Sequence, residues 1–487
     1  MKLKSVKWLS VILIIVLVSA IGLSGLVGCK TTTTTTTIAA AETTTTTAET
    51  TTTTSSSETT EAVKKSFWDR INAGEFKFNG VTINYMYQGG VGGFDDYAKA
   101  CAAEFEKLTG AKVILDPTPW ETQMPKIVND VTTGANRYDV FEGDIEFQYG
   151  LYNHMEELTP YIQKYGVNMD GYFKPMYTFG EWAGKGIRYG LPYSTGCSSF
   201  VIRKDVFDTA GIKYPFDTWD DFYAALKKLN DPAKDFYGIS FAGVNAQLVK
   251  MWLARYWGQG VSVYSKKWAP QVNDPEGVKA TQMMIDLIQY APKGVLGWDI
   301  PEAASAFLAG KTAVYENWMA ALAGKIDDPT QSKIAGKWLI IGAPGGGPTG
   351  NWTEHNLDLL KGSKNKDAAF VWMAYFTSEE RQLAWAQDEI NNKASGFEYA
   401  RTKPWTDVIL KAEPSRQGQF DANNSGIPIT PGLPQWLQAF MAIGENTGQA
   451  MSGKLTPEKA VEQLQLTLEQ IIEAQIPPYD NPEPNAK

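Results

Sequence analysis

Histidine is almost absent from this chain of 487 residues. The sequence holds only two, His154 and His355, about two hundred positions apart. Two isolated histidines exclude a histidine-rich metal site and a HExxH metalloprotease. They also argue strongly against a Ser-His-Asp hydrolase, because no GxSxG turn accompanies them. The sequence therefore lacks the side chains for the commonest metal-dependent and serine-dependent hydrolases.

Cysteine is scarce as well, with three residues in the whole chain. Cys29 lies in the N-terminal leader, so Cys101 and Cys197 remain for the folded part. A single bridge would be no framework for a protein of this size. An oxidising compartment would allow the two to pair. Cys101 lies on the apolar face of a predicted helix and Cys197 beside a predicted strand, which favours two small buried thiols.

No run of lysine and arginine interrupts an acidic composition. Lys and Arg number 45 and Asp and Glu 54, which gives a formal charge of −9. We therefore expect no nucleic-acid partner held by phosphate neutralisation. Two glycine-rich turns also fail as nucleotide sites. The Gly90-x-Gly92 turn reaches Asp95 where a dinucleotide fingerprint needs glycine, and the turn at 345–350 lacks the lysine and hydroxyl residue of a P-loop. We expect no cofactor and no metal.

The N-terminus has the pattern of a secretory leader. Lys2, Lys4 and Lys7 precede an almost unbroken apolar run at 9–27. Cys29 follows Leu26-Val27-Gly28 directly, and this arrangement resembles the bacterial lipobox, in which the cysteine is lipidated and becomes the first residue. We predict a signal peptide at 1–28 and a lipid anchor on Cys29. The alternative is an uncleaved anchor helix, since the run is long enough to span a bilayer.

Threonine dominates the segment that follows, in blocks at 31–37, 43–47 and 50–54. Such a segment buries no apolar area and cannot offset the entropy of ordering. We therefore predict that residues 29–62 form a lipidated, disordered linker that holds the folded body outside a membrane. Glycosylation of this linker is left open, because an unmodified spacer would serve equally well.

The rest of the chain reads as an α/β protein of two or three domains. Strand and helix alternate in the order strand 81–87, helix 95–108, strand 112–115, helix 121–133 and strand 138–141. This order predicts right-handed crossovers and a parallel sheet. Further extended segments are predicted at 190–193, 198–202, 238–241, 312–316 and 338–342. Thr218 and Thr456 have the sequence context of helix N-caps.

Polar and aromatic residues follow the first three predicted strands. The first strand leads into a glycine-rich turn, the second into Trp120, and the third into Glu142 and Asp144. Ligands bind at the carboxyl ends of strands in open parallel sheets, so these residues are candidates for a binding site. Glu142, Asp144 and Glu146, with Glu354 or Asp358, could also supply the two carboxylates of a glycosidase. Solvated or ligand-binding carboxylates are the simpler interpretation.

Tryptophan is abundant, with sixteen residues. Five of them adjoin Gly, Pro or Asn at predicted element ends, namely Trp120, Trp257, Trp318, Trp352 and Trp436. An aromatic ring can stack on the C–H face of a sugar, and it can equally fill a core. We expect several of the five to line one cleft.

Four segments carry a resemblance to a known family. GIKYP leads into TWDDF at 211–222, FLAGKTAVYENW occupies 307–318, SKNKDAA and TSEERQ lie within 363–382, and GKLTPEKA occupies 453–460. In this order, from about residue 80 to 475, they resemble family 1 extracellular solute-binding proteins. These are the carbohydrate-type receptors of ATP-binding-cassette (ABC) importers.

The resemblance implies a two-lobed fold of the type II periplasmic-binding-protein kind, with a ligand cleft between lobes joined by a multi-strand hinge. Lobe 1 would comprise 63–191 and 319–380, and lobe 2 would comprise 192–318 and 381–487. The chain would cross between the lobes near 192–194, again near 314–318, and a third time after the helix at 377–382.

The resemblance and the aromatic pattern together give one set of candidate ligand-binding residues: Trp120, Glu142, Asp144, Tyr193, Asn245, Trp257, Asn317, Trp318, Trp352 and Trp436. Two departures from the family pattern are the Ile202-Arg203-Lys204-Asp205 segment and the polar run at 351–356. The second leaves the identity of the ligand open.

The sequence thus predicts a monomeric receptor, lipid-anchored on the extracellular side, that captures a sugar or oligosaccharide for ABC permease subunits. We expect no enzymatic activity. One alternative is a receptor for a non-sugar solute such as a peptide or polyamine, and another is a secreted carbohydrate-active enzyme.

Overall fold

A computed structural model of the chain describes residues 65–89, 94–174, 187–345, 351–392, 397–483 and 485–486. Residues Val63–Lys487 form one compact unit. The predicted signal peptide, Cys29 and the threonine-rich linker lie outside the described residues, as does most of the turn at 345–350. No helix within the described ranges has both the length and the apolar character needed to cross a bilayer.

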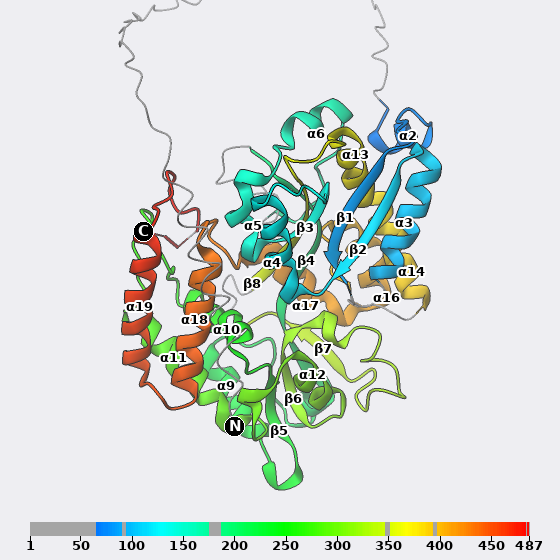
Figure 1. The fold of residues 1–487 in the computed structure, drawn as a ribbon. Coiled ribbons are helices and arrows are strands. Elements are labelled where there is room, and N and C mark those ends of the chain that lie inside the picture. Colours follow the sequence, from blue (N-terminus) through cyan, green and yellow to red (C-terminus); the bar gives the residue numbers. More distant parts are fainter. Residues whose placement is uncertain are drawn as a thin grey trace, which may run out of the picture. The chain divides into compact units, whose positions relative to one another are not determined.

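The first part of the unit is the predicted parallel sheet (Figure 1). The central strand β1 (Thr82–Gln88) pairs in parallel with β2 (Lys112–Thr118) on one side and β3 (Val140–Asp144) on the other. The connecting helices are α3 (Phe94–Thr109) and α4 (Trp120–Thr132). All five elements lie where the alternation of strand and helix predicts them, so the α/β prediction is confirmed here.

The sheet continues into a strand that the sequence pattern did not predict. β8 (Asn351–Leu359) pairs antiparallel with β3, and β9 (Ile427–Pro428) pairs with the start of β8. The β8 sequence is polar over most of its length and lacks a clear apolar alternation. Its strand character therefore depends on the neighbours on both sides.

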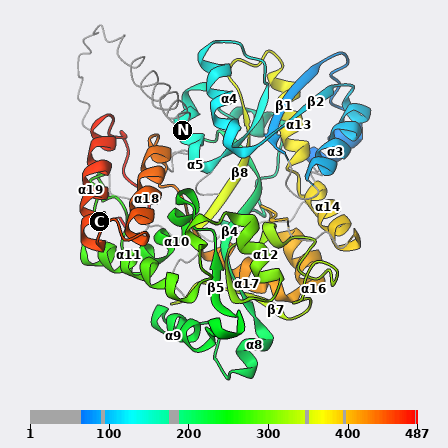
Figure 2. The ribbon, with the colours of Figure 1, turned by 60° about the horizontal axis from the view of Figure 1, so that its bottom comes forward.

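One long strand links two groups of strands (Figure 2). β4 (Gly190–Arg203) pairs with β8 through its first half, and with β6 (Thr312–Trp318) and β7 (Trp338–Ile341) through its second half. β5 (Tyr237–Phe241) pairs in parallel with β6. The segments predicted at 190–193 and 198–202 are thus one continuous strand, and the resemblance predicts the first crossing within it.

The strand pairing bears on the second crossing, which the resemblance places near 314–318. β6 and β7 both pair with the second half of β4, so the chain remains with this group of strands up to Ile341. An apolar cluster joins this stretch to β4 and β6, and includes Val201, Tyr315, Leu322, Ile334 and Ile340. The next paired strand is β8, which belongs to the other group of strands. The bounds of the two lobes stay a prediction.

A third segment returns to the crossing after α14 (Glu379–Asn392). The Thr195 amide of β4 donates to the Glu398 carbonyl over 2.8 Å, and the Ala400 amide donates to the Tyr193 carbonyl over 3.3 Å. This is where the sequence analysis expects a third crossing. An aromatic cluster anchors it, with the rings of Trp385 and Phe397 centred 3.7 Å apart.

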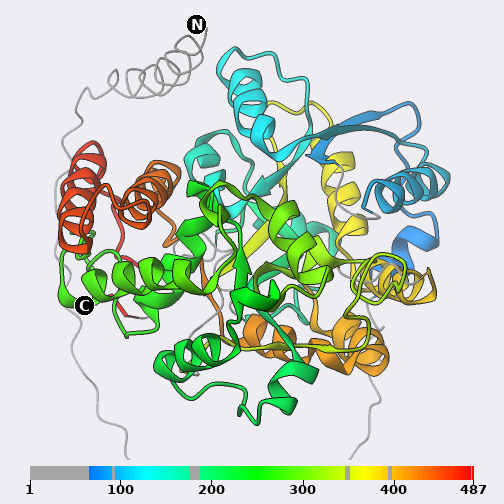
Figure 3. The same ribbon diagram turned by 90° about the horizontal axis from the view of Figure 1, so that it is seen from below.

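Four long helices pack beside the second half of the molecule (Figure 3, green and red to orange). They are α10 (Asn245–Trp257), α11 (Pro275–Leu287), α18 (Trp436–Met451) and α19 (Pro457–Glu473). Thr456 caps α19, and Thr218 caps α9 (Trp219–Leu229), as the sequence predicts. The apolar stripe of α19 is buried against its neighbours.

The unit contains further short helices, one of which is π-helical at Trp405–Ile409. The others are α2 (Phe67–Asn72), α5 (Ile145–Leu151), α6 (Thr159–Tyr165), α8 (Lys204–Thr209), α12 (Ile300–Leu308), α13 (Lys366–Phe376), α15 (Thr402–Pro404), α16 (Leu410–Ala412) and α17 (Gln417–Ser425). Cys101 of α3 is a buried free thiol. The side chain of Cys197 lies outside the described residues.

Candidate ligand-binding site

Two predicted acidic residues lie where β3 meets the first half of β4 by way of β8. Glu142 is 1% exposed, and its carboxylate accepts from the Gln88 amide over 2.6 Å. Its other oxygen lies 3.0 Å from Nδ1 of His355. Asp144 is also buried, at the end of β3, and its backbone pairs with that of His355. The register of β3 against β8 therefore sets Asp144 opposite the histidine that the Glu142 carboxylate contacts.

Tyr193 completes this side of the site. It lies on β4, hydrogen-bonds Glu142, and is centred 6.2 Å from the His355 ring. Burial raises the pKa of Tyr193 well above its ordinary value, and the nearby charge of Glu142 adds to the effect. The hydroxyl thus remains protonated and acts as a donor. One face of the ring packs on Phe94 at 5.3 Å, which fixes its orientation.

On the other side of the crossing, β6 ends at Trp318. The ammonium nitrogen of Lys250, from α10, lies 4.0 Å from the centroid of the Trp318 ring. This is a cation–π contact, and it covers one face of an indole that is otherwise partly exposed. Asn317 is buried, and its side-chain oxygen accepts from the Trp318 amide over 2.8 Å. Asn317 thus holds the backbone at Trp318.

Glu398 lies between these two sides. Burial raises the pKa of its carboxyl to about 8. The charges of Arg416, His355 and Lys250 act in the opposite direction, in that order of size. His355 belongs to the first side of the site and Lys250 to the second. Because the charges of both affect the pKa of Glu398, this carboxyl lies near both sides. We call Glu142, Tyr193, Lys250, Trp318, His355 and Glu398 the crossing cluster.

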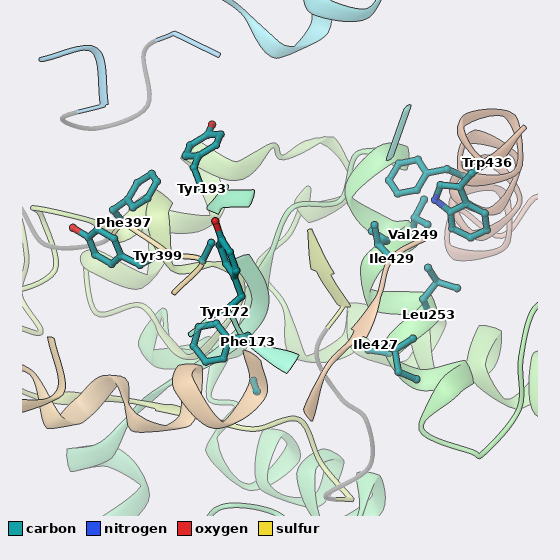
Figure 4. Packing of buried hydrophobic residues seen from close by; sticks show 14 of the residues in the cluster. Tyr172, Phe173, Tyr193, Val249, Leu253, Phe397, Tyr399, Ile427, Ile429 and Trp436 are labelled. Carbon is teal, nitrogen blue, oxygen red and sulfur yellow. The ribbon is translucent and has the colours of Figure 1, made fainter. Parts of the chain in front are cut away.

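Two predicted tryptophans lie elsewhere. Trp257 and Trp436 are each 1% exposed and belong to the apolar core. Figure 4 shows Trp436 against Val249 and Ile429, on the opposite side of the view from Tyr193 and Phe397. Neither indole presents a face to a ligand in this arrangement. Helix ends next to Gly or Pro are also places where a large ring fills the core, and this alternative holds for both residues.

Three predicted residues are described only through their backbone. Trp120 and Asn245 are the first residues of α4 and α10. Trp352, on β8, pairs with Cys197 where β4 passes from one group of strands to the other. Their side chains lie outside the described residues, as does that of Glu146, so their roles stay predictions.

Three members of the crossing cluster were missed by the sequence analysis. His355 lies in the polar run at 351–356, which was noted as a departure, so a signal existed. Lys250 is one of two cations in the largely apolar helix α10, the other being Arg255, and this is a weaker signal. No sequence signal pointed to Glu398, because it reaches β4 only when the third segment folds back to the crossing.

The chemistry of the cluster is that of recognition. Aromatic faces, carboxyls, an imidazole and an ammonium lie together, and the described residues contain no group of three His, Cys, Asp or Glu side chains able to hold a metal. Glu142 is already engaged by Gln88, Tyr193 and His355. These contacts fix the orientation of the carboxylate, and a carboxylate pairs with hydrogen-bond donors.

The fold defines a class: a two-lobed α/β binding protein. A model of the bacterial extracellular solute-binding protein family matches residues 92–383. The chain therefore belongs to this family of binding proteins, and it is not an enzyme.

Named relatives and a solved structure agree with that assignment. A probable amino-acid ABC transporter periplasmic-binding protein of Sinorhizobium fredii is 23% identical over 76% of this chain and 84% of its own. A mannitol-binding protein of Pseudomonas aeruginosa is 25% identical over 57% of this chain and 67% of its own. An ABC transporter solute-binding protein of Agrobacterium radiobacter K84, solved with ribitol, has a TM-score of 0.69 at 22% identity and covers 81% of this chain and 100% of its own. This last likeness concerns the fold.

Proposed function

We propose that this protein captures a sugar or polyol outside the cell and delivers it to the permease of an ABC importer. The observation that carries the proposal is the crossing cluster, which combines a partly exposed indole with buried, oriented hydrogen-bonding groups. A polyhydroxy ligand offers C–H faces for an aromatic ring and hydroxyls for carboxyl, imidazole and ammonium partners. The mannitol-binding relative and the ribitol complex support this choice.

Binding is coupled to a movement of the lobes. In this proposal lobe 1 contains the β1–β2–β3–β8 strands and lobe 2 the β5–β6–β7 strands, with β4 shared between them. A ligand that contacts both lobes binds the closed arrangement more tightly and so shifts the population toward it. Residues from both groups of strands lie in the crossing cluster, as such coupling requires.

The test is thermal unfolding of residues 62–487 with a panel of mono- and oligosaccharides, polyols, amino acids, peptides and polyamines. A ligand at one hundred times its dissociation constant adds roughly 2.7 kcal/mol to stability. We expect stabilisation by a sugar or polyol that is recovered chemically intact. If only an amino acid, peptide or polyamine stabilises the protein, the proposed ligand class is contradicted, and the protein is still a binding receptor.

The second candidate is a receptor for a non-sugar solute. The Sinorhizobium relative, which is named as a probable amino-acid binding protein, favours this second candidate. The buried carboxyls Glu142 and Asp144 would suit the ammonium group of such a ligand. The same panel separates the two candidates, because an amino acid would stabilise the protein and a polyol would not.

The proposal includes a lipid tether on the cell membrane, with a monomeric receptor facing outward. It rests on the lipobox-like Leu26-Val27-Gly28-Cys29 sequence and on the threonine-rich linker. The full chain carrying Cys29→Ala should appear in the culture medium or soluble fraction, while the unchanged chain stays with membranes. Retention of the variant on membranes would favour the uncleaved anchor helix.

A further inference from the structure

Glu398 lies against β4 at the crossing. A Cβ atom placed on Gly196 would lie 2.0 Å from a Glu398 carboxyl oxygen and 3.2 Å from Cε3 of Trp318. Only glycine leaves room for this approach, so the carboxyl and the edge of the indole both rest against the β4 backbone. The main chain of Glu398 is fixed as well, by the 2.8 Å hydrogen bond from the Thr195 amide.

The carboxyl is held from behind by α17. Gln419 is fully buried and donates through its side-chain amide to Glu398. The Gln419 oxygen accepts from Nε of Arg416 over 3.0 Å, and Arg416 also donates to the Phe397 carbonyl over 2.9 Å. The position of the carboxyl is therefore set by a chain of buried hydrogen bonds.

Charged and titratable groups face this carboxyl from four elements. They are Arg416 at the start of α17, His355 on β8, Lys250 on α10 and Tyr315 on β6. The cations favour the ionised form, but removal from water outweighs them and keeps the pKa near 8. At neutral pH the carboxyl is mostly protonated and can donate and accept one hydrogen bond each.

We propose that Glu398 is a positioning residue of the ligand site, whose carboxyl keeps Trp318 and Lys250 in register with His355 across the crossing so that the site takes an uncharged polyhydroxy ligand. This inference rests on the proposed function and names a residue through which that function acts. A neutral carboxyl adds no negative charge beside Trp318. An ammonium group on a ligand therefore gains little electrostatic attraction beside Trp318, whereas the binding of hydroxyl groups is not weakened.

The proposal predicts how affinity depends on pH. A ligand seated over Trp318 excludes water from the crossing, and this raises the pKa of Glu398 further in the complex. The complex then holds its proton at a pH where the free protein has lost it. By linkage, affinity falls as pH rises through 8 and above. A rise of about one pKa unit on binding would weaken affinity about sevenfold between pH 7 and pH 9.5.

The experiment measures dissociation constants for ribitol, mannitol and any sugar from the thermal panel by calorimetry between pH 6.5 and 9.5. We expect the unchanged protein to lose about sevenfold in affinity over this range. Glu398→Gln should bind within about threefold of the unchanged protein at pH 7, because it copies the neutral acid, and its profile should be flat. Glu398→Ala should bind more weakly at every pH. Glu483→Gln is the matched control, since Glu483 is another buried acid with a pKa near 7, hydrogen-bonded to Ser262. The Glu483→Gln variant should show the same loss of affinity with rising pH as the unchanged protein.

Different outcomes overturn different statements. A flat profile of the unchanged protein, or a slope that survives Glu398→Gln, removes the role of Glu398 and leaves the sugar receptor in place. Tight binding of an ammonium-bearing compound, with no response to any sugar or polyol, overturns the proposed ligand class and this inference together.

Discussion

Two regions of this protein are both largely buried, but one consists of apolar side chains and the other of polar ones. Around Trp436, the helices α10 and α18 bury an indole among aliphatic side chains such as Val249 and Ile429. At the crossing, Glu142 and Glu398 are buried together with Tyr193, and the His355 side chain beside Glu142 is 20% exposed. The first region gains stability from removing apolar area from water, whereas the second loses some of it by removing charge from water.

The comparison teaches that burial alone does not distinguish a core residue from a binding residue. A core can be filled by any well-packed apolar set, so polar groups at such depth cost stability unless they are paired. The crossing cluster keeps its carboxyls paired with His355, Tyr193 and Gln419. Proteins retain such costly arrangements chiefly at functional sites.

The largest expected effect comes from the apolar region. Trp436→Ala should lower the free energy of unfolding by about 3–5 kcal/mol, because it leaves a large cavity among packed side chains. Ligand affinity of the protein that remains folded should be unchanged. Chemical denaturation and calorimetry together measure both. A variant of unchanged stability with lost affinity would return Trp436 to the ligand site.

A smaller effect is expected from an acid beside the crossing. Glu389 is buried and accepts a hydrogen bond from Tyr399 over 2.5 Å; burial raises the pKa of its carboxyl from 4.5 to about 7. The folded state therefore holds this proton between about pH 4.5 and 7, where the unfolded state has released it. The related stability is complete below pH 4.5 and is lost as pH rises through 7, with an upper limit of about 3 kcal/mol.

Denaturation of Glu389→Gln between pH 4.5 and 8.5 checks this sign. The variant should lose less stability over the range than the unchanged protein, because its amide does not titrate. Lys403→Gln, on the exposed surface of the neighbouring short helix, serves as the control and should keep the full pH dependence. An identical slope in Glu389→Gln and the unchanged protein would contradict the burial argument.

The smallest expected effect on stability, and the clearest on binding, belongs to Trp318. Trp318→Ala should weaken sugar or polyol binding about tenfold, which corresponds to about 1.4 kcal/mol, since one stacking face is lost. Its unfolding free energy should fall far less than that of Trp436→Ala, because the indole is only partly buried. Lys250→Met is the companion variant and removes the cation from the ring. Unchanged affinity in Trp318→Ala would exclude this ring from the site.

Much of the fold could be predicted because its signals are local. The alternation of strand and helix from β1 to β3, and the N-caps Thr218 and Thr456, depend on residues close together in the chain. β8 could not be predicted in this way. A polar strand has no apolar alternation of its own, and its place in the sheet is set by pairing with strands far apart in sequence.

The candidate site was predicted in part, for the same reason. Glu142, Asp144, Tyr193, Asn317 and Trp318 follow strands or family motifs, and the structure brings them to the crossing. Trp257 and Trp436 have the same local setting as Trp318, yet their neighbours in space are apolar. No feature of the surrounding sequence separates these three indoles, because exposure is a property of the assembled fold.

By itself the sequence determined the class of protein, the leader pattern with Cys29, and the α/β order of elements, since all three are written in composition, periodicity and short motifs. Only the tertiary structure decided that one strand, β4, serves both groups of strands, and that His355, Lys250 and Glu398 meet beside it. The physical reason is that an interaction between polar groups forty residues or more apart in the chain is invisible to local pattern, and it acquires its energy only when folding removes the water between the groups.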